Sequence, residues 1–170
     1  MKIQGWLIDE HWKKIQRRVP VTCVDVLPIT ESVSGGIELG LIYRDTPHQG
    51  RRWCLIGGRL FRNEPFRRAV LRQVHDALGS GVRCVVNKAI QPLFVAEYFS
   101  QRLKGSLFDP RQHAVGLIFT VNIRGIISTS GETLDFRWFN SHELPIPRLF
   151  GFGQYRVVTE CASRLKERRR

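Results

Sequence analysis

An acid, an arginine and a polar pair form the part of this sequence that could do chemistry, within the segment GRLFRNEPFRRAVLRQVHDALG at residues 58–79. Glu64 and Arg72 carry opposite charges across that segment. Gln73 and Asp76 stand at positions i and i+3, which project from one side of a helix. Carboxylate and amide oxygens placed this way could hold a hard cation beside a phosphate. The alternative is that both are ordinary surface residues of a basic helix.

The same segment predicts a helix over residues 65–78 that would position these side chains. Its apolar stripe at helical spacing includes Val70 and Val74. Pro65 suits the first helical position, where its missing N–H costs nothing. Gly79 suits the residue after the last turn.

The rest of the chain predicts an α/β (α+β) sandwich, a mixed β-sheet flanked by helices. Apolar and β-branched runs predict strands at 21–28, 37–44, 52–56, 91–99, 114–123 and 134–139. Helical spacing predicts a basic amphipathic helix at 8–18 and a last helix marked by Tyr155, Val158, Cys161 and Leu165. The order of strands, helix, strands and helix indicates this sandwich. We expect an N-terminal helical segment at 1–18, the main domain at 19–165 and a basic tail at 166–170.

Composition indicates one globular domain and an anionic partner. The chain has 170 residues, 42% of them hydrophobic, and Lys+Arg 27 against Asp+Glu 15 gives a net charge of +12. Such charge favours a nucleotide, a nucleotide sugar or a nucleic acid, the alternative being simple solubility. The four cysteines are scattered without a C-x-x-C pair, which argues against structural zinc and for reduced thiols in a cytoplasmic protein. No signal-peptide core or membrane-spanning stretch is expected, and no membrane partner.

The frame Gly58-x5-Glu64-x7-Arg72, closed by Gly79, resembles the Nudix box, G-x5-E-x7-R-E-U-x-E-E-x-G-U, where U is a bulky apolar residue. The resemblance implies the Nudix fold, in which the box forms a loop-helix-loop on a mixed sheet. It also implies hydrolysis of a nucleoside diphosphate linked to another moiety, with Mg²⁺ or Mn²⁺ as cofactor. Within the box, Glu64 would orient the helix by pairing with Arg72.

The metal-binding acids of the box are only partly present. Gln73 stands where the box has glutamate after the arginine, and Asp76-Ala77 stands at the later glutamate pair. An amide oxygen, a short acid and a methyl group replace three charged ligands, so metal affinity should fall unless another acid helps.

Roughly residues 19–140 resemble one group of the superfamily, the GDP-mannose mannosyl hydrolases. The segments that carry this likeness are VPVTCVDVLPI, LIYRDTPHQGRRWCLIGGR, HAVGLIFTVNIRG and GETLDFRWFN. That group displaces at the sugar C1 and releases GDP and a hexose. The resemblance implies that Arg44 and Arg59 bind the diphosphate and that Asp25 lies near the sugar.

The resemblance also implies a metal set. Gly58 would offer its carbonyl and Glu132 its carboxylate. In a divergent hydrolase Asp76 would add a second carboxylate, and Gln73 could assist through water. Asp76, Glu132 and Arg59 would then be the catalytic residues.

Two departures leave two hypotheses for function. The last box glutamate of that group falls on Ala77, and its general-base histidine falls on Thr133, which cannot accept a proton near neutral pH. The first hypothesis is a divergent metal-dependent hydrolase of a nucleotide sugar. The alternative is a Nudix-fold module without turnover that binds a nucleotide or a nucleic acid, favoured by the missing acids and the basic termini.

A homodimer is a further implication of the resemblance. Trp6, Leu7 and Trp12 of the first helical segment could serve its interface. The alternative is that these side chains pack on their own sheet.

Overall fold

The computed structural model describes residues 7–32, 35–87 and 89–168, and it confirms a mixed sheet between helices. The α-helices are α1 (Asp9–Gln16), α2 (Phe66–Leu78) and α3 (Tyr155–Glu167), with 3₁₀ turns η1 (Pro147–Leu149) and η2 (Gly151–Gly153). The strands are β1 (Val21–Glu31), β2 (Ile37–Thr46), β3 (Gly50–Cys54), β4 (Ile56–Arg59), β5 (Val82–Val85), β6 (Phe94–Phe99), β7 (Leu107–Phe108), β8 (Ala114–Gly125) and β9 (Thr133–Asn140).

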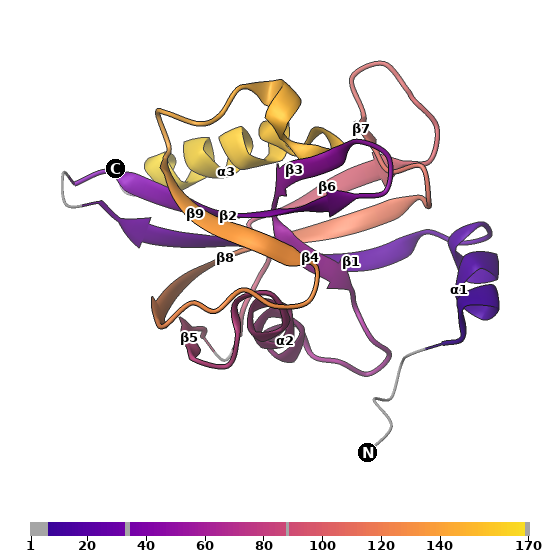
Figure 1. Ribbon diagram of the computed structural model, residues 1–170, viewed down its shortest axis with the longest axis horizontal. Coiled ribbons are helices and arrows are strands. Elements are labelled where there is room, and N and C mark those ends of the chain that lie inside the picture. The colour runs from indigo at the N-terminus through magenta and orange to yellow at the C-terminus, as the bar shows by residue number, and fades with distance from the viewer. Residues whose placement is uncertain (1–6, 33–34, 88, 169–170) are drawn as a thin grey trace.

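The sheet has the strand order β3-β2-β1-β8-β6-β7, and β4, β5 and β9 pair with β1, β8 and β2 respectively. β1 runs parallel to β8, with Val21 opposite Ala114, and antiparallel to β2 and β4. β6 runs antiparallel to β8 and parallel to β7. Figure 1 shows α2 on one face of this sheet and α3 on the other, with α1 beside the start of β1.

Cover on both faces explains the sequence of the central strand. Val24, Val26 and Leu27 of β1 are all fully buried, although neighbouring side chains of a strand point to opposite faces. A strand covered on both faces has a continuous apolar run instead of an alternating one. Burial of one such side chain contributes about 1.5–3 kcal/mol, so β1 is a major source of stability.

Helix α2 forms as its periodicity predicts. Val70, Val74 and Leu78 are fully buried against the sheet. Pro65 is the residue before the helix instead of its first residue, and its extended backbone (ψ 145°) sets the entry. Gly79 has φ +84°, a backbone that side chains with a Cβ rarely adopt, so glycine ends the helix there.

Several predicted bounds differ from the structure. The first helix covers Asp9–Gln16 instead of 8–18, and Leu7 lies before it. The short strands β5 and β7 have no predicted counterpart, because two to four residues are too few to show a period. Helix α3 continues to Glu167, so the expected tail from 166 is partly helical, and residues 169–170 lie outside the described part.

None of the helices within the described residues is long and apolar enough to cross a membrane.

Candidate functional site

A cavity of about 620 Å³ opens between α1, α2 and the sheet. Its walls come from segments far apart in the chain, including α1, the start of β4, the segment after β7 and the turn before β9. The predicted site residues that line it are Asp25, Arg44, Gly58, Arg59, Arg72, Gln73, Asp76 and Glu132. The structure therefore brings the predicted site together, while Glu64 and Gly79 frame the helix outside the lining.

The frame of the box is an ion pair between Glu64 and Arg72. Arg72 Nε donates to Glu64 Oε1 at 2.7 Å and Arg72 Nη2 to Oε2 at 2.8 Å, and Phe61 N–H donates to Oε2 at 3.0 Å. Burial alone would raise the pKa of Glu64, but these hydrogen bonds and the Arg72 charge lower it. Arg72 Nη2 also donates to the Arg59 carbonyl at 3.1 Å, which ties the end of β4 to α2.

Gln73 is buried, and its amide is used inside the frame. In the orientation that satisfies its partners, the amide oxygen accepts from Gly58 N–H at 3.2 Å and from Arg72 Nη1 at 3.1 Å. A Cβ on Gly58 would lie 2.8 Å from the nearest atom of the Gln73 amide group, so only glycine permits this close approach. The oxygen predicted to assist a metal is thus engaged by protein donors.

The two carboxylates of the predicted metal set are each paired with an arginine. The Asp76 side chain is 67% exposed, 3.8 Å from Arg72 Nη1, and the Glu132 side chain is 75% exposed and paired with Arg44. Ala77 is buried and offers no ligand. Within the described residues, no group of three or more His, Cys, Asp or Glu side chains could hold a metal ion. The residues present therefore do not fit a divalent metal centre of the box type.

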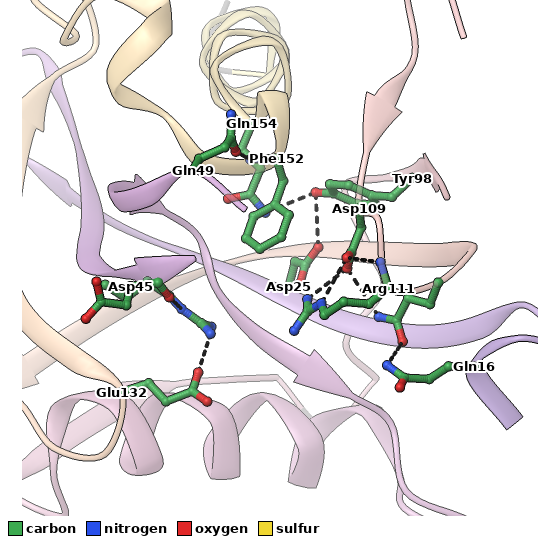
Figure 2. Close-up of polar contacts among 12 residues, drawn as sticks. Gln16, Asp25, Asp45, Gln49, Tyr98, Asp109, Arg111, Glu132, Phe152 and Gln154 are labelled. Carbon is green, nitrogen blue, oxygen red and sulfur yellow. Dashed lines mark hydrogen bonds and ion pairs between the residues drawn. The ribbon is translucent and has the colours of Figure 1, made fainter. Parts of the chain in front are cut away.

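The floor of the cavity is a hydrogen-bonded chain from Asp25 to α3. Figure 2 shows two of its links, in which Tyr98 OH donates to Asp25 Oδ2 at 3.4 Å and Gln154 Nε2 donates to Tyr98 OH at 3.1 Å. Leu55 N–H donates to Gln154 Oε1 at 2.9 Å. Burial raises the pKa of Asp25 to about 7, against the lowering effects of Tyr98 and Arg44. This carboxyl can therefore exchange a proton near neutral pH.

Glycines leave the room that the Asp25 carboxylate occupies. Pairing of β1 with β4 sets Gly57 opposite Asp25, and a Cβ on Gly57 would lie 2.1 Å from Asp25 Oδ1. A Cβ on Gly116 of β8 would lie 2.8 Å from Asp25 Oδ2. The two strands beside β1 thus make space for this acid at the cavity floor.

A further arginine of the cavity, Arg111, comes from the segment after β7, which lies between two of the predicted strands. Asp109 is buried and accepts from Arg111 Nε at 2.9 Å and from Arg111 Nη2 at 2.8 Å (Figure 2). Burial alone would lower the pKa of Arg111, but the Asp109 carboxylate raises it. The charges in FDPRQ are a weak signal, because nothing in the sequence places this loop at the cavity.

The other end of the cavity carries a stack of arginines and aromatic rings. The guanidinium of Arg59 lies 4.3 Å from the centroid of the Trp12 ring and 5.5 Å from that of Phe61. Arg72 lies 4.1 Å from the centroid of Phe61. Arginine over an aromatic face is attracted by the ring quadrupole and stays charged. Sequence reasoning assigned Trp12 to a dimer interface or to core packing and did not connect it with Arg59.

Solved structures share the fold of this chain, a mixed sheet between helices, and some of them are described as Nudix proteins. A structure described as possible asymmetric diadenosine tetraphosphate (Ap4A) hydrolases from Jonesia denitrificans is 28% identical, with a TM-score of 0.78 over 88% of this chain and 96% of that chain. A MutT Nudix hydrolase from Burkholderia pseudomallei, 20% identical, has a TM-score of 0.62 over 84% of this chain and 98% of that chain. The Nudix domain of Shewanella oneidensis NrtR, complexed with ADP ribose, is 17% identical, with a TM-score of 0.60 over 94% of this chain and 99% of that chain.

At the level of sequence, residues 2–154 match the family described as "Domain of unknown function (DUF4916)", and the chain belongs to that family. Among curated proteins, no sequence matches this chain.

Proposed function

We propose that this chain is a divergent Nudix-type hydrolase that binds a nucleoside diphosphate linked to another moiety in the cavity. One observation carries the proposal: arginines from three separate segments, Arg44, Arg59 and Arg111, line one cavity of about 620 Å³. This volume lies in the ordinary range for small-molecule sites. Guanidinium groups match phosphate oxygens with two parallel hydrogen bonds, which makes arginine well suited to a diphosphate.

The description of one similar structure and the ligand of another support the same chemical class. The Jonesia structure is described as possible Ap4A hydrolases, and the Shewanella domain is complexed with ADP ribose. Both compounds join a nucleoside to a second moiety through phosphates. A nucleotide sugar such as GDP-mannose belongs to the same class, so all three are candidate ligands.

The arginines take the role that carboxylate-bound Mg²⁺ or Mn²⁺ would have in a box with all its acids. Because the box residues do not fit a divalent metal, we assign the neutralisation of phosphate charge to Arg44 and Arg59. Asp25, with its pKa of about 7, would accept the proton of the attacking water. The water oxygen would bond to phosphorus or to the sugar carbon of the linkage. The bond from that atom to the leaving phosphate oxygen would break, and this oxygen would keep the electron pair beside the arginines while Asp25 holds the proton of the water.

A second candidate is binding without turnover. It is favoured by the Gln73 amide oxygen, which already accepts hydrogen bonds from Gly58 and Arg72, and by the pairing of Glu132 with Arg44. Such a module would recognise a nucleotide or, through the basic surface, a nucleic acid. Product release distinguishes the two candidates, because only the hydrolase consumes its ligand.

Calorimetric titration with ADP-ribose, GDP-mannose and Ap4A, in Mg²⁺ and in EDTA, tests the proposal. We expect one of them to bind equally well in both buffers, Arg44→Ala to weaken binding, and Arg67→Ala, on the exposed face of α2, to leave it unchanged. Chromatography of the products then shows whether the bound ligand is cleaved. Binding that disappears in EDTA would overturn the assignment to arginines.

A gain-of-function variant sharpens this test. Gln73→Glu with Ala77→Glu restores two box acids beside Asp76, and we expect it to acquire binding of Mn²⁺ that the natural chain lacks. Thermal unfolding of the variant checks that the fold survives. Equal Mn²⁺ binding by both proteins would show that the natural site already holds the metal.

The remaining sequence predictions stay part of this proposal. The division into a helical segment, a main domain and a tail, the homodimer and the cytoplasmic location are expectations for the same protein. Trp6 lies outside the described residues, whereas Leu7 is exposed and Trp12 is half-buried against Arg59. Sedimentation of the purified protein would decide the oligomeric state.

A further inference from the structure

Helix α1 has only two side chains that are not exposed, and both line the cavity. They are Trp12 and Gln16, which are half-buried, whereas every other residue of α1 is exposed. Positions i and i+4 lie one above the other on the same side of a helix. Since α1 buries no residue in the core, its contact with the body of the protein is concentrated at these two side chains.

Trp12 contacts the arginine at the end of β4. The Arg59 guanidinium lies 4.3 Å from the centre of the Trp12 ring, and the Arg72 donor to the Arg59 carbonyl holds the backbone beneath it. The ring of Phe61 contacts both guanidinium groups, with its centroid 5.5 Å from the Arg59 guanidinium and 4.1 Å from that of Arg72. Trp12 is therefore the outer member of a stack that ends in the Glu64–Arg72 ion pair of the box.

Gln16 contacts the arginine of the segment after β7 through two partners. Gln16 Nε2 donates to Gln112 Oε1 at 2.8 Å, and Gln112 Nε2 donates to Asp109 Oδ2 at 3.5 Å. Asp109 in turn holds Arg111 with two hydrogen bonds from the guanidinium, as Figure 2 shows. One face of α1 thus reaches two different arginines of the cavity.

We propose that α1 is part of the ligand site and that Trp12 and Gln16 are positioning residues for Arg59 and Arg111. The inference rests on the proposed function, because the ligand that these arginines would hold is the phosphate chain of a nucleoside diphosphate compound. Trp12 keeps the Arg59 guanidinium flat and limits its rotamers, which lowers the entropy lost when a phosphate binds. Gln16 fixes the Gln112 amide, so that Asp109 presents Arg111 in one orientation.

Ligand titration of α1 variants tests the proposal, with ADP-ribose as the probe. Trp12→Leu and Gln16→Ala should each weaken binding, Trp12→Leu by roughly 3- to 10-fold if a partly desolvated cation–π contact is lost. Trp12→Phe should retain most of the affinity, since it keeps an aromatic face. His11→Ala, an exposed neighbour on the same helix, is the matched control and should bind like the natural chain.

A double-variant cycle separates positioning from mere stability. If Trp12 acts through Arg59, Trp12→Leu should have no further effect on binding in an Arg59→Ala background. Independent, additive losses in the two variants would overturn the assignment. The assignment would also be overturned if Trp12→Leu and the natural chain bound the same probe with equal affinity.

A measurement without ligand keeps this inference distinct from the proposed function. The Nε–H resonance of Arg59 should lie upfield under the Trp12 ring and move downfield in Trp12→Leu, while Arg111 should respond to Gln16→Ala only. Unchanged arginine resonances would refute positioning whether or not any probe binds. If the resonances shift but no probe binds to the natural chain, the positioning stands and the proposed ligand class fails.

Discussion

Replacement of Glu132 by glutamine distinguishes a surface carboxylate that competes for Arg44 from one that holds a metal. Glu132 lies in the turn before β9 with its side chain 75% exposed, and it pairs with Arg44, whose side chain is 16% exposed. Glu132→Gln keeps the shape and removes the charge. The partly buried Arg44 guanidinium then loses the Glu132 carboxylate as its partner and becomes available to a phosphate.

The magnitude follows from the exposure of the pair. Exposed ion pairs contribute about 0.2–1 kcal/mol, so release of Arg44 should tighten ADP-ribose binding by about 1.4- to 5-fold. The free energy of unfolding should fall by less than about 1 kcal/mol for the same reason. Salt screens this effect, so the gain should shrink at high ionic strength.

Calorimetry at low and high salt provides the assay, with Glu160→Gln as the control. Glu160 pairs with Arg164 on the surface of α3, outside the cavity, so this variant makes the same charge change away from the site. We expect Glu160→Gln to leave the affinity nearly unchanged. If Glu132→Gln instead weakens binding tenfold or abolishes a response to Mg²⁺, Glu132 is a metal or ligand contact and the reasoning is refuted.

Three further predictions concern the frame and the floor of the cavity. Glu64→Gln should lower the free energy of unfolding in urea by about 3 kcal/mol, because it breaks a partly buried ion pair; a loss below about 1 kcal/mol would mean that Arg72 finds another partner. Gly57→Ala should lower the unfolding free energy by about 1–3 kcal/mol, since its Cβ would lie 2.1 Å from Asp25 Oδ1, and an unchanged melting temperature would contradict this crowding. The pKa of Asp25 rises from 3.8 to about 7 on folding, so its contribution to stability is fully present below the unfolded value and is lost as pH rises through the folded value. Between about pH 5 and pH 8 the free energy of unfolding of the natural chain should therefore fall by about 3 kcal/mol, whereas that of Asp25→Asn should not. Parallel pH profiles of the two proteins in urea unfolding would refute a buried, protonated Asp25.

Patterns between residues close together in the sequence were enough to predict helix α2 and the order of strands and helices. The helical stripe of Val70 and Val74 and the glycine after the helix identify α2, and the resemblance to the Nudix box implies the ion pair of Glu64 with Arg72 that frames it. These features depend on neighbours within one or two turns or one loop. The mixed sheet between helices follows from the order of such elements, whereas short strands such as β5 leave too little pattern to detect.

The use of each polar group was decided by packing between distant segments. Asp25 meets Tyr98 across 73 positions of the chain, and Gln16 meets Gln112 across 96. The sequence by itself determined that the box keeps its frame and lacks two of its acids, because frame and acids are read from spacing within one short segment, residues 58–79. Only the tertiary structure decided that Gln73 turns its oxygen inward, since hydrogen-bond partners and burial exist only once the segments have come together.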